Sequence, residues 1–259
     1  MLGTSLNYVA ARILGMSASD PALVRARAWI RANGGAVTVP SWGKFWLSVL
    51  NVYDWSGMMP LQPELWLLPT ALPFHPSRFW CHTRMVQLPM SYIYGARITA
   101  PINDFIRSLR EEIYVTPYES IDWSYARSAI CERDNYSPHT RTLEALTLAL
   151  VGYEKYLALP WLRSKAMSEV AMLVKAEDEA TKGICIGPVS KMMNAIVAWH
   201  AEGQQSRWFV MHLDRMRDYL WMGKEGVRLT GTNGTQSWDA SFMALALVEA
   251  GTISLFCLW

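Results

Sequence analysis

The sequence has 259 residues, a hydrophobic content of 51% and a formal net charge of +2. This length and apolar content suffice to bury one large core or two smaller ones, which excludes an intrinsically disordered chain. The nearly balanced charge contains no basic run of the kind that binds a phosphate backbone, so nucleic acid is excluded as a partner.

The N-terminal part of the chain predicts helices joined by short loops. Residues 5–15 predict a short helix, and Asp20 followed by a proline predicts the start of a second helix that runs to about residue 32. The Asn-Gly-Gly sequence at 33–35 is expected to end it. Ser41 is predicted to cap a third helix. Its apolar residues recur at helical spacing and are expected in the core: Trp42, Phe45, Trp46, Val49 and Leu50.

A proline-rich passage follows at 60–76 and contains the apolar run Leu65-Trp66-Leu67-Leu68-Pro69. One interpretation is a loop that is buried in the core. The other is an exposed apolar patch that enters the surface of a membrane. The sequence favours these two interpretations equally.

The next predicted helix starts at Ser77 and carries a histidine among aromatic and apolar residues. One face of this helix holds three residues, Arg78, His82 and Met85. The adjacent stripe holds three more, Trp80, Thr83 and Gln87. A lone histidine in such surroundings is ordinarily a hydrogen-bonded core residue.

The rest of the chain predicts further helices and, at most, incidental sheets. Residues 103–114 form an amphipathic helix with a charged, solvated face. Longer helices are expected at 139–158, 163–180, 188–202, 207–221 and 235–250. No two-residue alternation is sustained, so the predicted fold class is all-α, with antiparallel helix pairs arranged as a bundle or as a ring.

The sequence indicates neither a transmembrane helix nor a disulfide or metal site. No segment has the roughly 18 uncharged apolar residues of a transmembrane helix, so any membrane contact is expected at a surface. The cysteines lack CxxC spacing and the histidines lack a ligand-like pattern. We therefore expect no disulfide framework and no metal site, and a reducing compartment. The cysteines and histidines on which this expectation rests are Cys81, Cys131, Cys185, Cys257, His200 and His212.

Five strings of the sequence are specific enough to suggest a family. They are WCHTR at 80–84, PSWGKFWLSVLNVYDW at 40–55, LREEIYVTPYESIDW at 109–123, ICIGPVSK at 184–191 and DYLWMGKEGVRLTGTNGTQSWD at 218–239. The first resembles the WCHCR motif of the oxidosqualene cyclases, the lanosterol synthase branch of the terpene cyclase/mutase family. The other four resemble the same family, and the resemblance extends from about Leu6 to about Gly251.

The resemblance implies a fold, a reaction and a location. The cyclases are built of two α–α barrels, and residues 5–251 are expected to form a toroid-like helical barrel domain, mostly the inserted non-catalytic barrel. Residues 252–259 form a tail that does not resemble the family. The implied activity is an isomerase reaction without a cofactor, in which 2,3-oxidosqualene is cyclised to lanosterol or a related triterpene. The implied location is intracellular, on the surface of the endoplasmic reticulum membrane or of a lipid droplet.

The resemblance also implies roles for individual residues. His82 matches the histidine proposed to stabilise late cations and to take part in the terminal deprotonation. Trp80 and Trp238 match tryptophans of the cavity, and Trp42 matches one that approaches it. Aromatic faces stabilise a desolvated cation by about 2 kcal/mol or more without offering a nucleophilic lone pair. The alternative for each residue is a buried structural role. The string around Trp238 also belongs to the QW-type repeats said to tie helices together.

Three departures from the family pattern bear on activity. Thr83 and Gln87 stand where the family has a cysteine and a tyrosine, at positions associated with the constriction between substrate channel and cavity. The polar amide of Gln87 is expected to weaken the passage of an apolar polyene. The family's catalytic acid lies in a downstream Asp-Cys-Thr-Ala-Glu motif, and the 259 residues contain no such string. A truncated gene product, or a misread exon boundary after Gly251, is one hypothesis, which transcript sequencing across that junction tests.

Three functional hypotheses follow. The first is an internal fragment of an oxidosqualene cyclase, which lacks the acid and is inactive alone. The second is a non-catalytic helical module that binds a membrane or a full-length cyclase as partner. A weaker third is a lipid-binding domain that uses the aromatic wall without chemistry. A search of the surrounding genomic DNA for an in-frame segment that encodes the acid motif discriminates between the first two.

Overall fold

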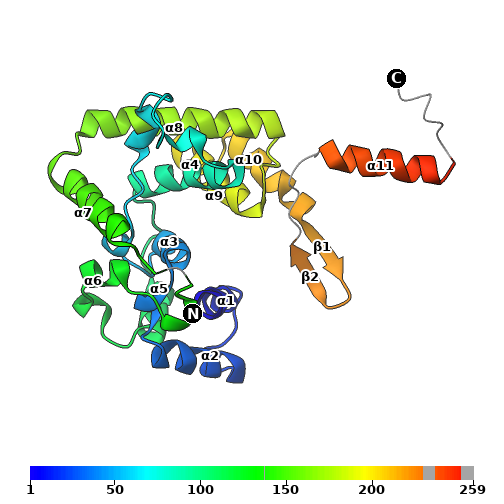
Figure 1. The fold of residues 1–259 in the computed structure, drawn as a ribbon. Helices are drawn as coiled ribbons and strands as arrows, with labels where there is room; N and C mark the ends of the chain where they lie inside the picture. Colours follow the sequence, from blue (N-terminus) through cyan, green and yellow to red (C-terminus); the bar gives the residue numbers. More distant parts are fainter. Residues whose placement is uncertain (137, 230–236, 252–259) are drawn as a thin grey trace. The chain divides into compact units, whose positions relative to one another are not determined.

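The computed structural model describes residues 1–136, 138–229 and 237–251, with the side chains of the last segment described from residue 241 onward. Figure 1 shows that helices dominate the chain. It divides into two compact units. Unit 1 comprises Met1–Glu64 and Ile93–Met167, and unit 2 comprises Leu65–Tyr92 and Ser168–Trp259. The prediction of an all-α fold is confirmed.

Unit 1 holds the N-terminal helices and the middle of the chain. Its α-helices are α1 (Leu2–Ile13), α2 (Pro21–Ala32), α3 (Ser41–Val49), α5 (Asp104–Ile113), α6 (Trp123–Ser128) and α7 (Arg141–Tyr156). Short 3-10 helices lie between them: η1 (Ala36–Thr38), η2 (Trp55–Gly57), η5 (Tyr118–Ser120) and η6 (Glu132–Asp134). Helices α4 (Cys81–Gly95) and α8 (Pro160–Thr181) and the 3-10 helix η3 (Pro63–Leu67) contribute residues to both units.

Local signals set where these helices begin. The Asp20 carboxylate accepts a hydrogen bond from the Ala22 amide at 2.8 Å, and Pro21 occupies the first helical position of α2. The Asn103 side chain caps α5 in the same way, through the Ile106 amide at 2.9 Å. Ser41 does not cap α3, contrary to the prediction, because it is the first residue of that helix and makes no capping hydrogen bond.

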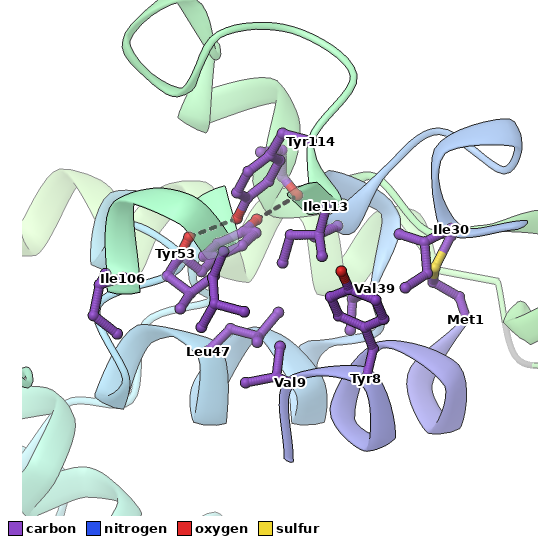
Figure 2. Close-up of a cluster of buried hydrophobic side chains, with 14 of the residues drawn as sticks. Met1, Tyr8, Val9, Ile30, Val39, Leu47, Tyr53, Ile106, Ile113 and Tyr114 are labelled. Atoms are coloured by element: carbon purple, nitrogen blue, oxygen red, sulfur yellow. Dashed lines mark hydrogen bonds between the residues drawn. The ribbon is translucent and has the colours of Figure 1, made fainter. Parts of the chain in front are cut away.

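The core of unit 1 is one cluster of buried apolar side chains (Figure 2). Helix α1 packs against α2 and α3, and α2 packs against α5. Tyrosines supply much of the buried volume, and Tyr114 donates a hydrogen bond to the Val52 carbonyl at 2.9 Å. The labelled members of the cluster are Met1, Tyr8, Val9, Ile30, Val39, Leu47, Tyr53, Ile106, Ile113 and Tyr114.

Helix α3 buries a different set of residues from the predicted one. The buried residues are Gly43, Lys44, Phe45, Leu47 and Ser48, whereas Trp42 and Trp46 are only half-buried. The Lys44 ammonium is fully buried and donates to the carbonyls of Ala126 at 2.6 Å, Arg127 at 3.2 Å and Ala129 at 2.8 Å. These carbonyls lie at the C-terminal end of α6, where unsatisfied acceptors favour a cation. Burial lowers the pKa of Lys44 to about 8.

Replacement of Lys44 by methionine is expected to lower the free energy of unfolding by about 3 kcal/mol, because buried carbonyls then lose their charged donor. Methionine fills most of the lysine volume, so the loss reports the hydrogen bonds rather than a cavity. Urea denaturation measures the change. Lys165→Met is the control, since Lys165 is exposed on α8 and is expected to change stability by less than about 0.5 kcal/mol. Equal stability of the two variants would contradict the prediction.

Unit 2 contains α9 (Pro188–Glu202), α10 (Arg207–Asp214) and α11 (Ser237–Glu249), with the 3-10 helices η4 (Pro76–Arg78) and η7 (Arg215–Tyr219). The prediction of a helix over 207–221 is wrong in its last part. The chain leaves α10 through η7 and enters β1 (Leu220–Gly223), which pairs antiparallel with β2 (Gly226–Leu229). Gly226 has a φ of 117°, which glycine adopts without strain.

Among the described helices, none combines the length and the apolar content that crossing a membrane requires.

Candidate functional site

Trp80 and His82 lie next to each other at the start of α4. Their ring centroids are 4.3 Å apart and the ring planes are inclined by 36°. Helix α4 begins at Cys81 and not at Ser77, since the short helix η4 ends at Arg78. Trp80 therefore precedes the helix, contrary to the predicted stripe, and its carbonyl accepts the Arg84 amide at 2.9 Å. The Cys81 sulfur lies 3.3 Å from Nδ1 of His82.

The Trp80 side chain is 69% exposed, which contradicts the alternative of a buried structural residue. Two further aromatic residues from the same passage are also exposed, Phe74 by 60% and Phe79 by 38%. We call Phe74, Phe79 and Trp80 the aromatic triplet. His82 follows this triplet in the sequence and is half-buried on the first turn of α4. The passage thus exposes three aromatic side chains, one of which, Trp80, lies beside His82.

Thr83 and Gln87 differ in their surroundings. Thr83 is exposed on the first turn of α4, whereas Gln87 is half-buried and its Oε1 atom has no hydrogen-bond partner. A buried amide oxygen without a partner is costly, by about 1–3 kcal/mol. Gln87 is therefore a half-buried polar residue with one unpaired acceptor. The effect on passage of a polyene stays a prediction.

The proline-rich passage contains a histidine whose role the sequence did not indicate. His75 is buried, its Nδ1 accepts the Ser77 amide at 3.0 Å, and its ring meets that of Trp66 edge to face at 6.2 Å. Trp66 in turn donates to the Ser91 hydroxyl at 3.1 Å. Its neighbours Leu65, Leu67 and Leu68 are half-buried, so this apolar run is neither fully buried nor fully exposed.

The described residues do not test whether the other predicted cavity tryptophans approach this place. Trp42 belongs to unit 1, where its ring lies 6.5 Å from those of Phe45 and Trp46. The backbone of Trp238 lies in α11, and its side chain falls outside the described residues. The predicted convergence of Trp80, His82 and Trp238 on one concavity stays a prediction.

The arrangement at the start of α4 suits the stabilisation of a cation. The tryptophan face offers a negative quadrupole, and the half-buried histidine offers a nitrogen that can accept a proton. Residues 65–92 contain no aspartate and no glutamate. The site is therefore able to hold positive charge but has no local group to generate it.

Comparison with known proteins gives a consistent result. The profile of the squalene-hopene cyclase N-terminal domain matches residues 2–221. Cycloartenol synthase from Dictyostelium discoideum is 46% identical over 99% of this chain and 36% of its own length. Human lanosterol synthase is 47% identical over 97% of this chain and 34% of its length. Protostadienol synthase A from Neosartorya fischeri is 41% identical over the same shares.

The comparisons show the type of fold and how much of the relatives' length this chain spans. The matched domain is of the α–α toroid type, which confirms the predicted architecture of helix pairs. The chain spans about a third of the length of the curated relatives it matches.

Proposed function

Because the chain belongs to the family of the squalene-hopene cyclase N-terminal domain, we propose that it is part of an oxidosqualene cyclase and that Trp80 and His82 face the substrate in the complete enzyme. The observation that carries the proposal is the close pair of the exposed Trp80 and the half-buried His82, whose ring centroids are 4.3 Å apart. Its proposed substrate is 2,3-oxidosqualene, and the reaction needs no cofactor. His82 would stabilise a late cation and accept the final proton.

This chain alone is proposed to be inactive. Opening an epoxide needs a positioned proton donor, and the family's Asp-Cys-Thr-Ala-Glu motif does not occur in the 259 residues. Incubation of the purified chain with 2,3-oxidosqualene tests this part of the proposal.

Membrane contact is the third part of the proposal. The aromatic triplet is exposed, and aromatic side chains partition favourably into the interfacial region of a bilayer. An enzyme acting on a polyene needs a route by which that lipid enters. We assign the route to the aromatic triplet together with the run Leu65–Pro69, in which the first four residues are half-buried and Pro69 is exposed. The proposed location is the endoplasmic reticulum membrane or a lipid droplet.

Flotation with phosphatidylcholine vesicles tests this assignment. Phe74→Asp is expected to lower the bound fraction about tenfold, because an exposed phenylalanine contributes roughly 1.5–3 kcal/mol when fully buried. Leu67→Asp should have a smaller effect, since that side chain is already half-buried. Leu14→Asp is the control: Leu14 is 85% exposed but belongs to unit 1. Equal flotation of Phe74→Asp and the wild-type protein would contradict membrane binding through these residues.

A second candidate function is a non-catalytic module that binds a protein partner. Helix α7 and the start of α8 favour it, because large apolar side chains there are exposed: Leu146, Leu148, Tyr156, Leu157, Leu159 and Trp161. Co-purification with a full-length cyclase would support this function, whereas vesicle binding without a partner would support the first.

A further inference from the structure

Three side chains that commonly bind metals meet in the interior of unit 2. Asp178, Cys185 and His212 are each almost completely buried, and their ligand atoms all lie within 4.8 Å of one another. Oδ2 of Asp178 is 3.0 Å from Nε2 of His212, and its Oδ1 is 3.4 Å from the Cys185 sulfur. The three residues come from α8, the loop after it and α10, which explains why their spacing in the sequence gave no indication of a site.

The separations agree with those between ligands of one ion. A tetrahedral zinc site with bonds of about 2.0–2.3 Å places neighbouring ligand atoms about 3.3–3.6 Å apart. The two distances from Asp178, 3.0 and 3.4 Å, need only small side-chain adjustments to reach this range. A carboxylate, a thiolate and an imidazole together form a donor set that suits zinc, since its ligands are nitrogen, sulfur and oxygen.

Asn194 supplies a fourth donor and an independent indication. It is fully buried on α9, and its amide nitrogen lies 2.8 Å from Oδ1 of Asp178 and 3.6 Å from the Cys185 sulfur. Its Oδ1 atom has no hydrogen-bond partner. Rotation of the amide by 180° exchanges the two atoms, and the unpartnered oxygen then points at the other three ligands. Nδ1 of His212 is likewise buried and has no hydrogen-bond partner.

The loop between α8 and α9 is held in the conformation that presents Cys185. Lys182, Gly183 and Cys185 all have φ between 55° and 73°, which is costly for the two residues that are not glycine. The buried Lys191 ammonium donates to the Gly183 carbonyl at 2.6 Å, and the Tyr219 hydroxyl donates to the next carbonyl, that of Ile184. These contacts hold the Cys185 sulfur near Asp178 without a bound metal.

An approach to the cluster exists on one side. A groove of about 310 Å³ is lined by apolar residues of α9 and α10, among them Trp199 and Phe209, and by His212 itself. An ion that enters here meets the imidazole first. Lys191 also lines this groove, so the approach carries one positive charge that the ion has to pass.

From this geometry we infer that Asp178, Cys185, His212 and Asn194 form a buried binding site for a divalent transition metal of the zinc class, distinct from the surface around Trp80. A cysteine thiol carries its proton at neutral pH, whereas zinc binds the thiolate. Binding therefore exchanges one proton for the ion: the S–H bond breaks, a sulfur–metal bond forms, and the proton leaves to solvent.

Cobalt(II) is the probe for the site. Titration of the full chain with Co²⁺ under reducing, oxygen-free conditions is expected to produce a near-ultraviolet thiolate-to-cobalt band and intense visible bands at one equivalent. Zn²⁺ should then bleach them. Cys185→Ser should remove the thiolate band. Cys131→Ser is the matched control, because Cys131 is an equally buried cysteine of unit 1 and should leave the spectrum unchanged. Asp178→Asn and His212→Gln should each weaken binding at least about tenfold.

Native mass spectrometry of the wild-type chain provides a readout that does not depend on whether the variants fold. One Zn²⁺ retained per chain, with release of one proton detected by a pH indicator, supports the site. Absence of a cobalt band in the folded wild-type protein would overturn the inference and identify the cluster as a hydrogen-bonded network alone. A thiolate band that persists in Cys185→Ser would overturn it too, because the ion would then be bound by another cysteine.

Discussion

The purified 259-residue chain is expected to form no tetracyclic or pentacyclic product from 2,3-oxidosqualene. A general acid within hydrogen-bond reach of the epoxide oxygen contributes about 10²- to 10⁴-fold to such a step. The acid motif of the family is absent from these residues. Trp80 stabilises a cation only after one has formed, and His82 accepts a proton only at the end of a cascade that does not start.

Two carboxylates of the described residues are already engaged by neighbouring side chains. Glu64 is paired with Arg163 at 2.5 Å, and Asp178 is buried against His212. Neither of these two is free to reach an epoxide oxygen. Asp239 adjoins Trp238 in sequence and is the residue we would expect to act if turnover occurred, but its side chain lies outside the described residues.

Gas chromatography with mass spectrometry of the lipid extract measures the result. A full-length lanosterol synthase, assayed in the same detergent, is the positive control. Cyclised product from the chain alone would contradict the prediction, and an Asp239→Asn variant would then show whether that carboxylate supplies the proton.

Unfolding at alkaline pH is the second large effect that we expect. Burial raises the pKa values of Tyr53, Tyr94 and Tyr114 well above the usual value near 10. The folded chain therefore keeps these protons above pH 10, whereas the unfolded chain releases them. The stabilisation by these tyrosines is fully present below pH 10 and falls as the pH rises. The free energy of unfolding decreases by about 1.4 kcal/mol per pH unit for each tyrosine, and by roughly 4 kcal/mol per pH unit for all three.

A domain with about 5–15 kcal/mol of stability should thus unfold cooperatively between about pH 11 and pH 13. Lys44 acts in the opposite direction, because burial lowers its pKa to about 8, but its contribution to stability changes only up to about pH 10.5. Lys44 therefore does not offset the three tyrosines above that pH.

Far-UV circular dichroism and tyrosinate absorbance, followed together from pH 8 to 13, measure this transition. The two signals should change at the same pH. Tyr53→Phe removes one buried hydroxyl and should make the loss of stability with pH shallower by about 1.4 kcal/mol per pH unit. A gradual rise in tyrosinate absorbance with the helices intact would show that the hydroxyls are accessible in the folded state.

The sequence determined the helical class, most helix positions and the family. These features depend on neighbours within a few residues: an aspartate before a proline starts α2, and Asn103 caps α5. The contiguous strings around Trp80 and Trp238 identified the family for the same reason, since each is complete within a short stretch of chain. The sequence also placed a histidine beside a tryptophan, although it put the start of α4 four residues too early.

Only the tertiary structure decided which polar groups are buried and what they contact. Helical spacing predicted a tryptophan face for α3, yet Lys44 is buried because its acceptors, 82 to 85 residues away, close over it. Asp178 and His212 are 34 residues apart, and they meet because α8 and α10 enclose the loop that carries Cys185. Periodicity reports one face of one helix, whereas a buried charge or a metal site depends on partners that other elements bring to it.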